Sequence, residues 1–298
     1  MSRVMKLAIG SMLVSFVVLG LKMLAWWVTG SVALLSDALE STVNVVTALA
    51  ALLAIRVAAL PADANHPYGH HKAEFFSAVL EGVMIIIAAL VILRAAFLGF
   101  LAPAPLDAPA LGLVFTGIAT VLNGAWCWAL LTHGRRLNSP ALVADGKHLF
   151  ADVLTSIGVA LGLVLALATG WWVLDPLMAS IVALVILWSG SKVVKQSLSG
   201  LLDEAVPEAT LQTIRSTIAA HATGAVQAHD IRTRHAGQRI FIDFHLVVPG
   251  ESTVNAAHEV CDAVEAALMA AVENANVTIH VEPEEKAKQA GSVTVLPE

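Results

Sequence analysis

Four polar residues that could hold a metal ion lie inside two otherwise apolar stretches of this chain. Glu40 and Asn44 occur within SVALLSDALESTVNVV, and His148 and Asp152 occur within DGKHLFADVLTS. Each pair is spaced four residues apart, so each pair projects from one face of a helix. Carboxylate, amide and imidazole groups that converge from two facing helices make a tetrahedral site for a divalent transition metal. The pattern therefore predicts a metal site within the apolar part of the molecule.

A structural role is the alternative for some of these residues. A single Asn in a spanning helix is more often an interhelical hydrogen-bond partner than a ligand. Unpaired buried carboxylates such as Glu40 and Asp152 are far more costly, and Lys22 in the first apolar stretch is an alternative partner for them. Asp37 borders the face of Glu40, and we expect it to line a pathway rather than to bind metal.

Two strands expected near the C-terminus bring a second set of polar side chains together. In RIFIDFHLVV (239–248) the apolar residues alternate, which leaves His245 on the opposite face. In NVTIHVE (276–282) the valines and the isoleucine take the apolar face, so His280 and Glu282 point away together. A shared polar face with two histidines and a carboxylate suits a metal ion.

The elements that position these residues follow from composition and hydropathy. Hydrophobic residues make up 57% of the 298 residues and charged residues 13%, and the mean hydropathy of +0.77 indicates a membrane protein. Runs near the roughly 20 residues that a bilayer requires predict membrane spans. The expected spans are residues 7–29, 32–58, 77–101, 109–132, 142–169 and 171–194.

Lysine and arginine set the expected orientation of these spans. They gather at the N-terminus, in the second and fourth connections and just after the sixth span, whereas the other three connections contain none. The positive-inside rule therefore predicts that both termini are cytoplasmic.

After residue 195 the apolar signal stops and a soluble pattern begins. A helix over 207–221, strands over 225–234 and 239–248, a helix over 252–272 and a strand over 276–282 give the order α-β-β-α-β. The predicted fold class is an all-α membrane domain of six helices (1–200) followed by a small cytoplasmic α+β domain (201–283), with helices on one face of its sheet. The tail, 284–298, is expected to be disordered.

Together, the six spans, the two pairs four residues apart, the polar loop PADANHPYGHHKAE (61–74) and the α-β-β-α-β domain resemble the cation diffusion facilitator family, especially its bacterial ferrous-iron and zinc efflux branch. The resemblance covers about residues 5–283. It implies a homodimeric, multi-pass antiporter of the bacterial inner membrane, which exports a cytoplasmic divalent metal in exchange for protons. Zinc is the favoured ion, with Fe²⁺, Co²⁺, Mn²⁺ and Ni²⁺ as alternatives.

The resemblance also assigns residues to three metal sites. The transport site falls on Glu40, Asn44, His148 and Asp152, and a cytoplasmic loop site falls on Asp63, His66 and His70. A dimer-interface site falls on His229, His245, His258, His280 and Glu282. This chain departs from the common pattern, which has Asp at both positions of the second span and at the last interface position. The longer Glu40 and the neutral Asn44 weaken the case for strict zinc selection and leave the other metals open.

Chemistry and missing motifs narrow the function. Metal ligands bind in their deprotonated form, so the membrane quartet can hold either a metal ion or protons, and His148 is the best proton carrier. HEVCD (258–262) distantly resembles a zinc-protease helix but lacks the second histidine, so no enzyme is expected. The sequence has no Gly-rich phosphate loop to suggest ATP, and no nucleic-acid partner is expected. A metal sensor or scaffold without transport is the alternative, and it would lose the membrane quartet.

Overall fold

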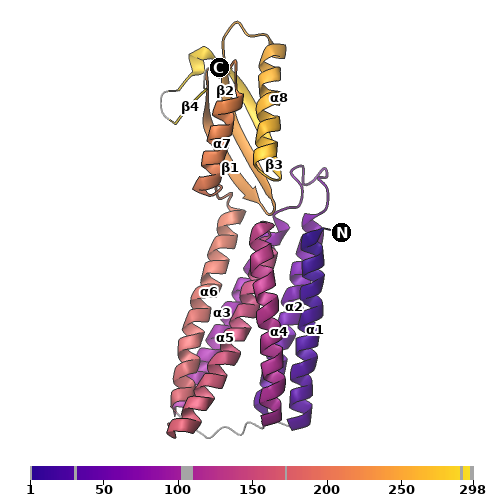
Figure 1. Ribbon diagram of the computed structural model, residues 1–298, viewed down its shortest axis with the longest axis vertical. Coiled ribbons are helices and arrows are strands. Elements are labelled where there is room, and N and C mark those ends of the chain that lie inside the picture. The colour runs from indigo at the N-terminus through magenta and orange to yellow at the C-terminus, as the bar shows by residue number, and fades with distance from the viewer. Residues whose placement is uncertain (1, 30–31, 102–109, 172, 289–290, 296–298) are drawn as a thin grey trace. The chain divides into compact units, whose positions relative to one another are not determined.

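The computed structural model describes residues 2–29, 32–101, 110–171, 173–288 and 291–295, except for the side chains of some helical residues, among them Asp37 and Glu40 (Figure 1). The chain divides into two compact units, Met1–Leu198 and Ser199–Glu298. The division lies close to the boundary expected at residue 200.

Within the described residues, the first unit consists of six long helices, as the hydropathy pattern predicts, and they run side by side as a bundle (Figure 1). They are α1 (Arg3–Thr29), α2 (Val32–Ala58), α3 (Ala73–Leu101), α4 (Ala110–Arg136), α5 (Pro140–Thr169) and α6 (Leu174–Leu201). Pro140 stands at the first position of α5, where its missing N–H has no intrahelical partner to lose.

Hydropathy differs among these helices. In the part of the chain that the structure describes, the stretches long and apolar enough to cross a bilayer are Arg3–Leu24, Ala73–Leu101 and Pro176–Leu201. In α2 and α5 the apolar run is interrupted by the ionisable residues of the predicted metal site. Polar residues are tolerated at this depth only where neighbouring helices enclose them, which places the polar faces of α2 and α5 toward the interior of the bundle.

Helix α5 contributes to each of the apolar cores described in the membrane unit. Leu142 and Leu149 of α5 pack with Ile55 of α2 and Leu130 of α4. Further along α5, Ala151 packs in a second core with side chains of α3 and α6. Helix α5 therefore packs against α2 and α4 through one core and against α3 and α6 through another.

Helices α3 and α6 approach each other closely at two glycines. A Cβ atom added to Gly82 would lie 2.7 Å from Val194 Cγ2, and one added to Gly190 would lie 2.8 Å from Ile85 Cγ2 and 3.2 Å from the carbonyl oxygen of Gly82. Small residues allow membrane helices to pack backbone against backbone. The spacing of α3 and α6 therefore depends on the absence of side chains at these two positions.

The second unit has the predicted helix and strand order, with one further short strand. Its elements are α7 (Glu208–His221), β1 (Gln227–Ala236), β2 (Arg239–Val248), α8 (Val254–Ala271), β3 (Ala275–Pro283), the 3₁₀ helix η1 (Glu284–Lys286) and β4 (Val293–Thr294). The sheet order is β3-β2-β1-β4, with β2 and β3 parallel and the other pairs antiparallel. The fold class predicted from the sequence is confirmed.

One face of this sheet is covered by α7 and α8, as Figure 1 shows. Ile218 of α7 and Leu268 of α8 share a core with Ile242 and Phe244 of β2. The predicted alternation in β3 holds for its first half, whereas Val281 is 39% exposed and stands outside the core. The opposite face of the sheet is free of these helices and presents the polar side chains.

Two local features set the register of the strands. Gly237 has φ 58° at the first position of the two-residue turn between β1 and β2, a conformation that a type II′ hairpin turn requires and glycine adopts readily. The pairing of β1 with β2 is interrupted between His229 and Arg232 by a bulge, where Asp230 has φ 52°.

The tail was expected to be disordered, but Val293–Thr294 pair with Gln227 and Ala228 of β1, because the edge of β1 offers unpaired backbone groups.

Candidate metal centres

Asn44 of α2 and His148 of α5 meet in the interior of the membrane unit. His148 Nε2 donates to Asn44 Oδ1 over 2.7 Å, and the two residues are 6% and 3% exposed. Asp152 lies one turn further along α5 and is also buried. Glu40 lies one turn before Asn44 on α2, but its side chain is outside the described residues. Of the four residues predicted to form the transport site, helices α2 and α5 thus bring together Asn44, His148 and Asp152.

A cavity of about 310 Å³ lies beside these three residues. Asn44, His148 and Asp152 supply polar groups to its lining, and most of the remaining lining is apolar. The apolar lining residues are Met84, Ile85, Ile87, Ala88, Val91, Ile92, Ala151 and Ile186. His148 Nδ1 and Asn44 Nδ2 are buried without a hydrogen-bond partner. Both atoms are therefore available to interact with a bound ligand or water. A cavity with a few convergent polar groups suits a small ligand that those groups can bind.

Asp152 is held by two residues from other helices. Lys22 Nζ of α1 lies 3.3 Å from Asp152 Oδ1, and Asn123 Nδ2 of α4 donates to Asp152 Oδ2. The sequence left open whether Lys22 pairs with a membrane carboxylate, and in the structure it pairs with Asp152. The sequence reasoning missed Asn123, although an amide in the middle of an apolar run is a usable signal.

Two further buried carboxylates were also missed. Asp145 lies on α5 one turn before His148 and accepts from Ser11 Oγ of α1. Glu81 of α3 accepts from Ser77 Oγ over 3.2 Å and interacts electrostatically with Asp145. Their signal in the sequence was an acidic residue inside an apolar helix. They add acidic groups to the buried interior of the membrane unit.

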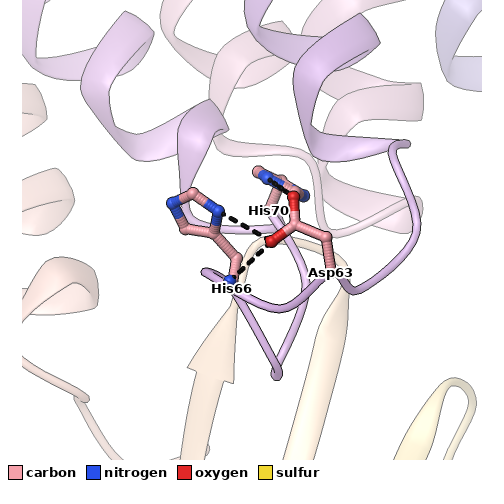
Figure 2. A group of neighbouring side chains, drawn as sticks. All are labelled: Asp63, His66 and His70. Atoms are coloured by element: carbon pink, nitrogen blue, oxygen red, sulfur yellow. Dashed lines mark hydrogen bonds and ion pairs between the residues drawn. The ribbon is translucent and has the colours of Figure 1, made fainter.

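The loop between α2 and α3 brings Asp63, His66 and His70 together, and Figure 2 shows the Asp63 carboxylate directed at both imidazoles. Asp63 Oδ1 lies 3.2 Å from His66 Nδ1, and Asp63 Oδ2 lies 3.4 Å from His70 Nε2. Ligand atoms around one tetrahedral zinc ion at about 2.0–2.2 Å are roughly 3.3–3.6 Å apart. The loop therefore already has nearly the spacing that a metal ion requires.

Backbone contacts hold this loop and its charge. The backbone N–H groups of Asn65 and His66 donate to Asp63 Oδ1 over 2.9 Å and 2.7 Å. These donors, that of His66 above all, lower the pKa of the Asp63 carboxyl below 3.8. Asp63 is therefore an anion throughout the physiological pH range, which a metal ligand must be.

In the second unit, three histidines occupy adjacent strands at one level of the sheet. His245 of β2 pairs in register with His229 of β1 and with His280 of β3. Glu282 Oε1 lies 3.2 Å from His245 Nδ1 and 3.7 Å from His280 Nε2, and Glu282 Oε2 lies 3.3 Å from His229 Nε2. His229 is fully buried. These spacings again suit a shared metal ion.

Not every predicted residue joins this cluster, and one joins it that was not predicted. His258 is exposed on α8, where its Nε2 lies 3.6 Å from Asp262 Oδ1, away from the sheet histidines of the same chain. Asp230, turned by the bulge in β1, lies 4.0 Å from His245 Nδ1. Its carboxylate is bound by Lys288 Nζ at 2.6 Å, which is the main reason that the pKa of Asp230 is lowered. No periodic pattern predicts a bulge, so Asp230 had no signal in the sequence.

Sequence comparison assigns both units to one family. The family description "Cation efflux transmembrane domain" matches residues 8–202, and "Cation efflux protein, cytoplasmic domain" matches residues 206–284. The protein therefore belongs to the cation efflux family, also called the cation diffusion facilitators, and this confirms the resemblance read from the sequence. It is a membrane protein of a class that transports metal cations.

Individual relatives extend over most of the chain. An uncharacterized transporter of Synechocystis sp. is 46% identical over 282 residues, covering 95% of this chain and 90% of that protein. The cation-efflux pump FieF of Shewanella oneidensis is 35% identical over 266 residues, covering 88% of each chain. A solved structure of CzrB in its zinc form is 42% identical and covers 29% of this chain and 99% of that chain, with a TM-score of 0.27.

Proposed function

We propose that this protein exports divalent transition-metal ions from the bacterial cytoplasm in exchange for protons. It acts as a homodimer in the inner membrane, with both termini in the cytoplasm. The observation that carries the proposal is the cavity of about 310 Å³ among the helices of the membrane unit, whose lining includes the buried polar residues Asn44, His148 and Asp152. A binding site among membrane-spanning helices is suited to moving an ion across the bilayer.

Proton exchange follows from the chemistry of the ligands. Imidazole and carboxylate groups bind a metal ion only when deprotonated, so protons and metal compete for His148 and Asp152. If one conformation favours the metal and the other favours protons, alternating exposure couples the two fluxes. The inward proton gradient then drives metal outward.

The ligand set favours borderline metals. One imidazole, one amide oxygen and carboxylates suit zinc, and the amide of Asn44 makes iron, cobalt, manganese and nickel competitors. Zinc is the first substrate to test because both cytoplasmic clusters, Asp63–His66–His70 and the sheet histidines, have the atom spacing of a zinc site.

The proposal is tested by metal flux into proteoliposomes that contain the purified full chain and an imposed pH gradient. We expect zinc flux that collapses when the gradient is dissipated, and we expect Asp152→Ala to abolish it. Asp243→Ala, which removes an exposed carboxylate from the second unit, serves as the matched control. Near-normal flux in Asp152→Ala, or flux indifferent to the pH gradient, would disprove this mechanism.

A metal sensor without transport is the second candidate, and it is favoured by the histidine cluster of β1, β2 and β3. It predicts that the parent protein binds zinc but gives no flux with any metal. The same proteoliposome measurement therefore separates the two functions.

A further inference from the structure

A lysine is buried among the polar residues of the membrane unit. Lys22 of α1 is 1% exposed, so its ammonium does not reach the membrane surface by snorkelling. Its Nζ lies 3.3 Å from Asp152 Oδ1. An ammonium at this depth is costly unless an anion compensates its charge, so Asp152 is acting as the counter-ion of Lys22.

In this arrangement both oxygens of Asp152 are engaged. Oδ1 faces Lys22, and Oδ2 accepts from Asn123 Nδ2. A metal ion about 2.0–2.2 Å from Oδ1 would lie within roughly 5.5 Å of the ammonium. At this distance, in a low-dielectric interior, a dication and an ammonium repel each other strongly. Asp152 therefore cannot bind the Lys22 ammonium and a divalent metal ion tightly at the same time.

Among the ligands whose side chains are described, neither Asn44 nor His148 supplies the missing negative charge. Asn44 is neutral, and His148 is hydrogen-bonded to it at the same cavity. With Lys22 paired to Asp152, and with His148 uncharged, the described part of the site has no net charge. A divalent ion therefore gains little from this part of the site until Lys22 releases the carboxylate.

We propose that Lys22 is a tethered cation that competes with the transported metal for Asp152. Its ammonium occupies the carboxylate when the metal is absent and withdraws when the metal binds. When the ammonium returns, the metal loses a ligand, so Lys22 weakens metal binding and speeds release. This inference rests on the proposed transport site and gives Lys22 a role in setting its affinity.

The experiment compares Lys22→Met, Lys22→Gln and Lys22→Arg in the full chain. Co²⁺ is the probe, and its visible absorption reports on the geometry of its ligands. The membrane-site signal is the part of Co²⁺ binding that Asp152→Ala removes, which subtracts the loop and the second unit. Lys6→Met, at an exposed lysine of the same helix, is the matched control.

We expect Lys22→Met to tighten Co²⁺ binding at the membrane site by about tenfold to a hundredfold, the range for a lost ionic hydrogen bond. In proteoliposomes KM and kcat should both fall, because binding is tighter and release is slower. Lys22→Gln should tighten binding less, Lys22→Arg should stay near the parent, and Lys6→Met should not change it. In the Asp152→Ala background, Lys22→Met should have no effect on Co²⁺ binding.

Unchanged or weaker Co²⁺ binding in both neutral variants would show that Lys22 is only a structural partner, and would overturn the proposal. If neither variant folds without metal, rescue of the fold by Co²⁺ supports competition and failure of rescue overturns it. Transport by the parent that is lost in Asp152→Ala but insensitive to Lys22 would reject this inference while keeping the proposed function. A Co²⁺ affinity that depends on Lys22, in a protein that gives no metal flux, would keep the competition between Lys22 and metal but reject the proposed transport function.

Discussion

Adding one methyl group at Gly190 tests whether the close approach of α3 and α6 is required. The new Cβ would lie 2.8 Å from Ile85 Cγ2 and 3.2 Å from the carbonyl oxygen of Gly82. Neither contact is relieved cheaply, because Ile85 is β-branched and the carbonyl belongs to a helix backbone. Ile85 also lines the cavity, so a forced shift of this side chain changes the shape of the candidate transport site.

The expected size of the effect combines two opposing contributions. Overpacking a close contact costs about 1–3 kcal/mol, whereas replacing glycine by alanine inside a helix gains about 1 kcal/mol. Gly190→Ala should therefore destabilise the protein by roughly 0–2 kcal/mol. The matched control is Gly20→Ala on α1, where an added Cβ meets no atom within 4 Å. The helix contribution cancels between the two variants, so their difference of about 1–3 kcal/mol measures the packing cost alone.

The assay is thermal unfolding of the detergent-purified full chain, supported by zinc flux in proteoliposomes. Each 1 kcal/mol shifts Tm by about 2–4 °C in a protein of this size range. Gly190→Ala should melt below Gly20→Ala and should transport more slowly. Equal melting temperatures for the two variants would refute the close approach of α3 and α6 as described.

Three further predictions concern the metal centres. Asn44→Asp adds a carboxylate to the membrane site, so calorimetry should show tighter divalent-metal binding with a changed pH dependence, and an unchanged profile for every metal would remove Asn44 from the ligands. The double variant His245→Ala/His280→Ala should reduce the zinc-dependent rise in Tm of the full chain while reducing flux only in part, and an unaltered rise would leave these histidines as ordinary sheet residues. The pKa of Asp63 is lowered from 3.8, so the contribution of its charge to the loop is fully present above pH 3.8 and is lost only as the pH falls through the lower folded pKa. Asp63→Asn should therefore weaken metal binding by the loop by a similar factor at about pH 7 and about pH 5. A factor that shrinks at the lower pH would contradict this prediction.

Periodicity predicted the elements of this protein well because it reports burial directly. The apolar runs predicted the six helices of the membrane unit, and strand alternation predicted that His245 and His280 share a face. A four-residue spacing also predicted that His148 and Asp152 point the same way from α5, and both line one cavity.

Pairing between elements was harder to predict, because helix periodicity does not fix how neighbouring helices rotate and shift against each other. Lys22 had more than one carboxylate within plausible reach, and only the packed bundle selects Asp152. Asn123 is a partner of Asp152 for the same reason. Asp230 depends on a bulge, which breaks the period on which strand predictions rest.

The three histidines of the sheet have a spacing that the backbone dictates. Ring centroids of His229 and His245 are 5.3 Å apart, and those of His245 and His280 are 4.9 Å apart, close to the separation of about 4.8 Å between hydrogen-bonded strands. Substitutions in the core beneath the histidines can change the stability of the domain without altering the spacing of the three rings. A slip of one residue in either strand pairing would turn a histidine to the helix-covered face and dismantle the cluster at once. The histidine cluster therefore tolerates substitutions in the surrounding core, but it requires the exact register of β1, β2 and β3.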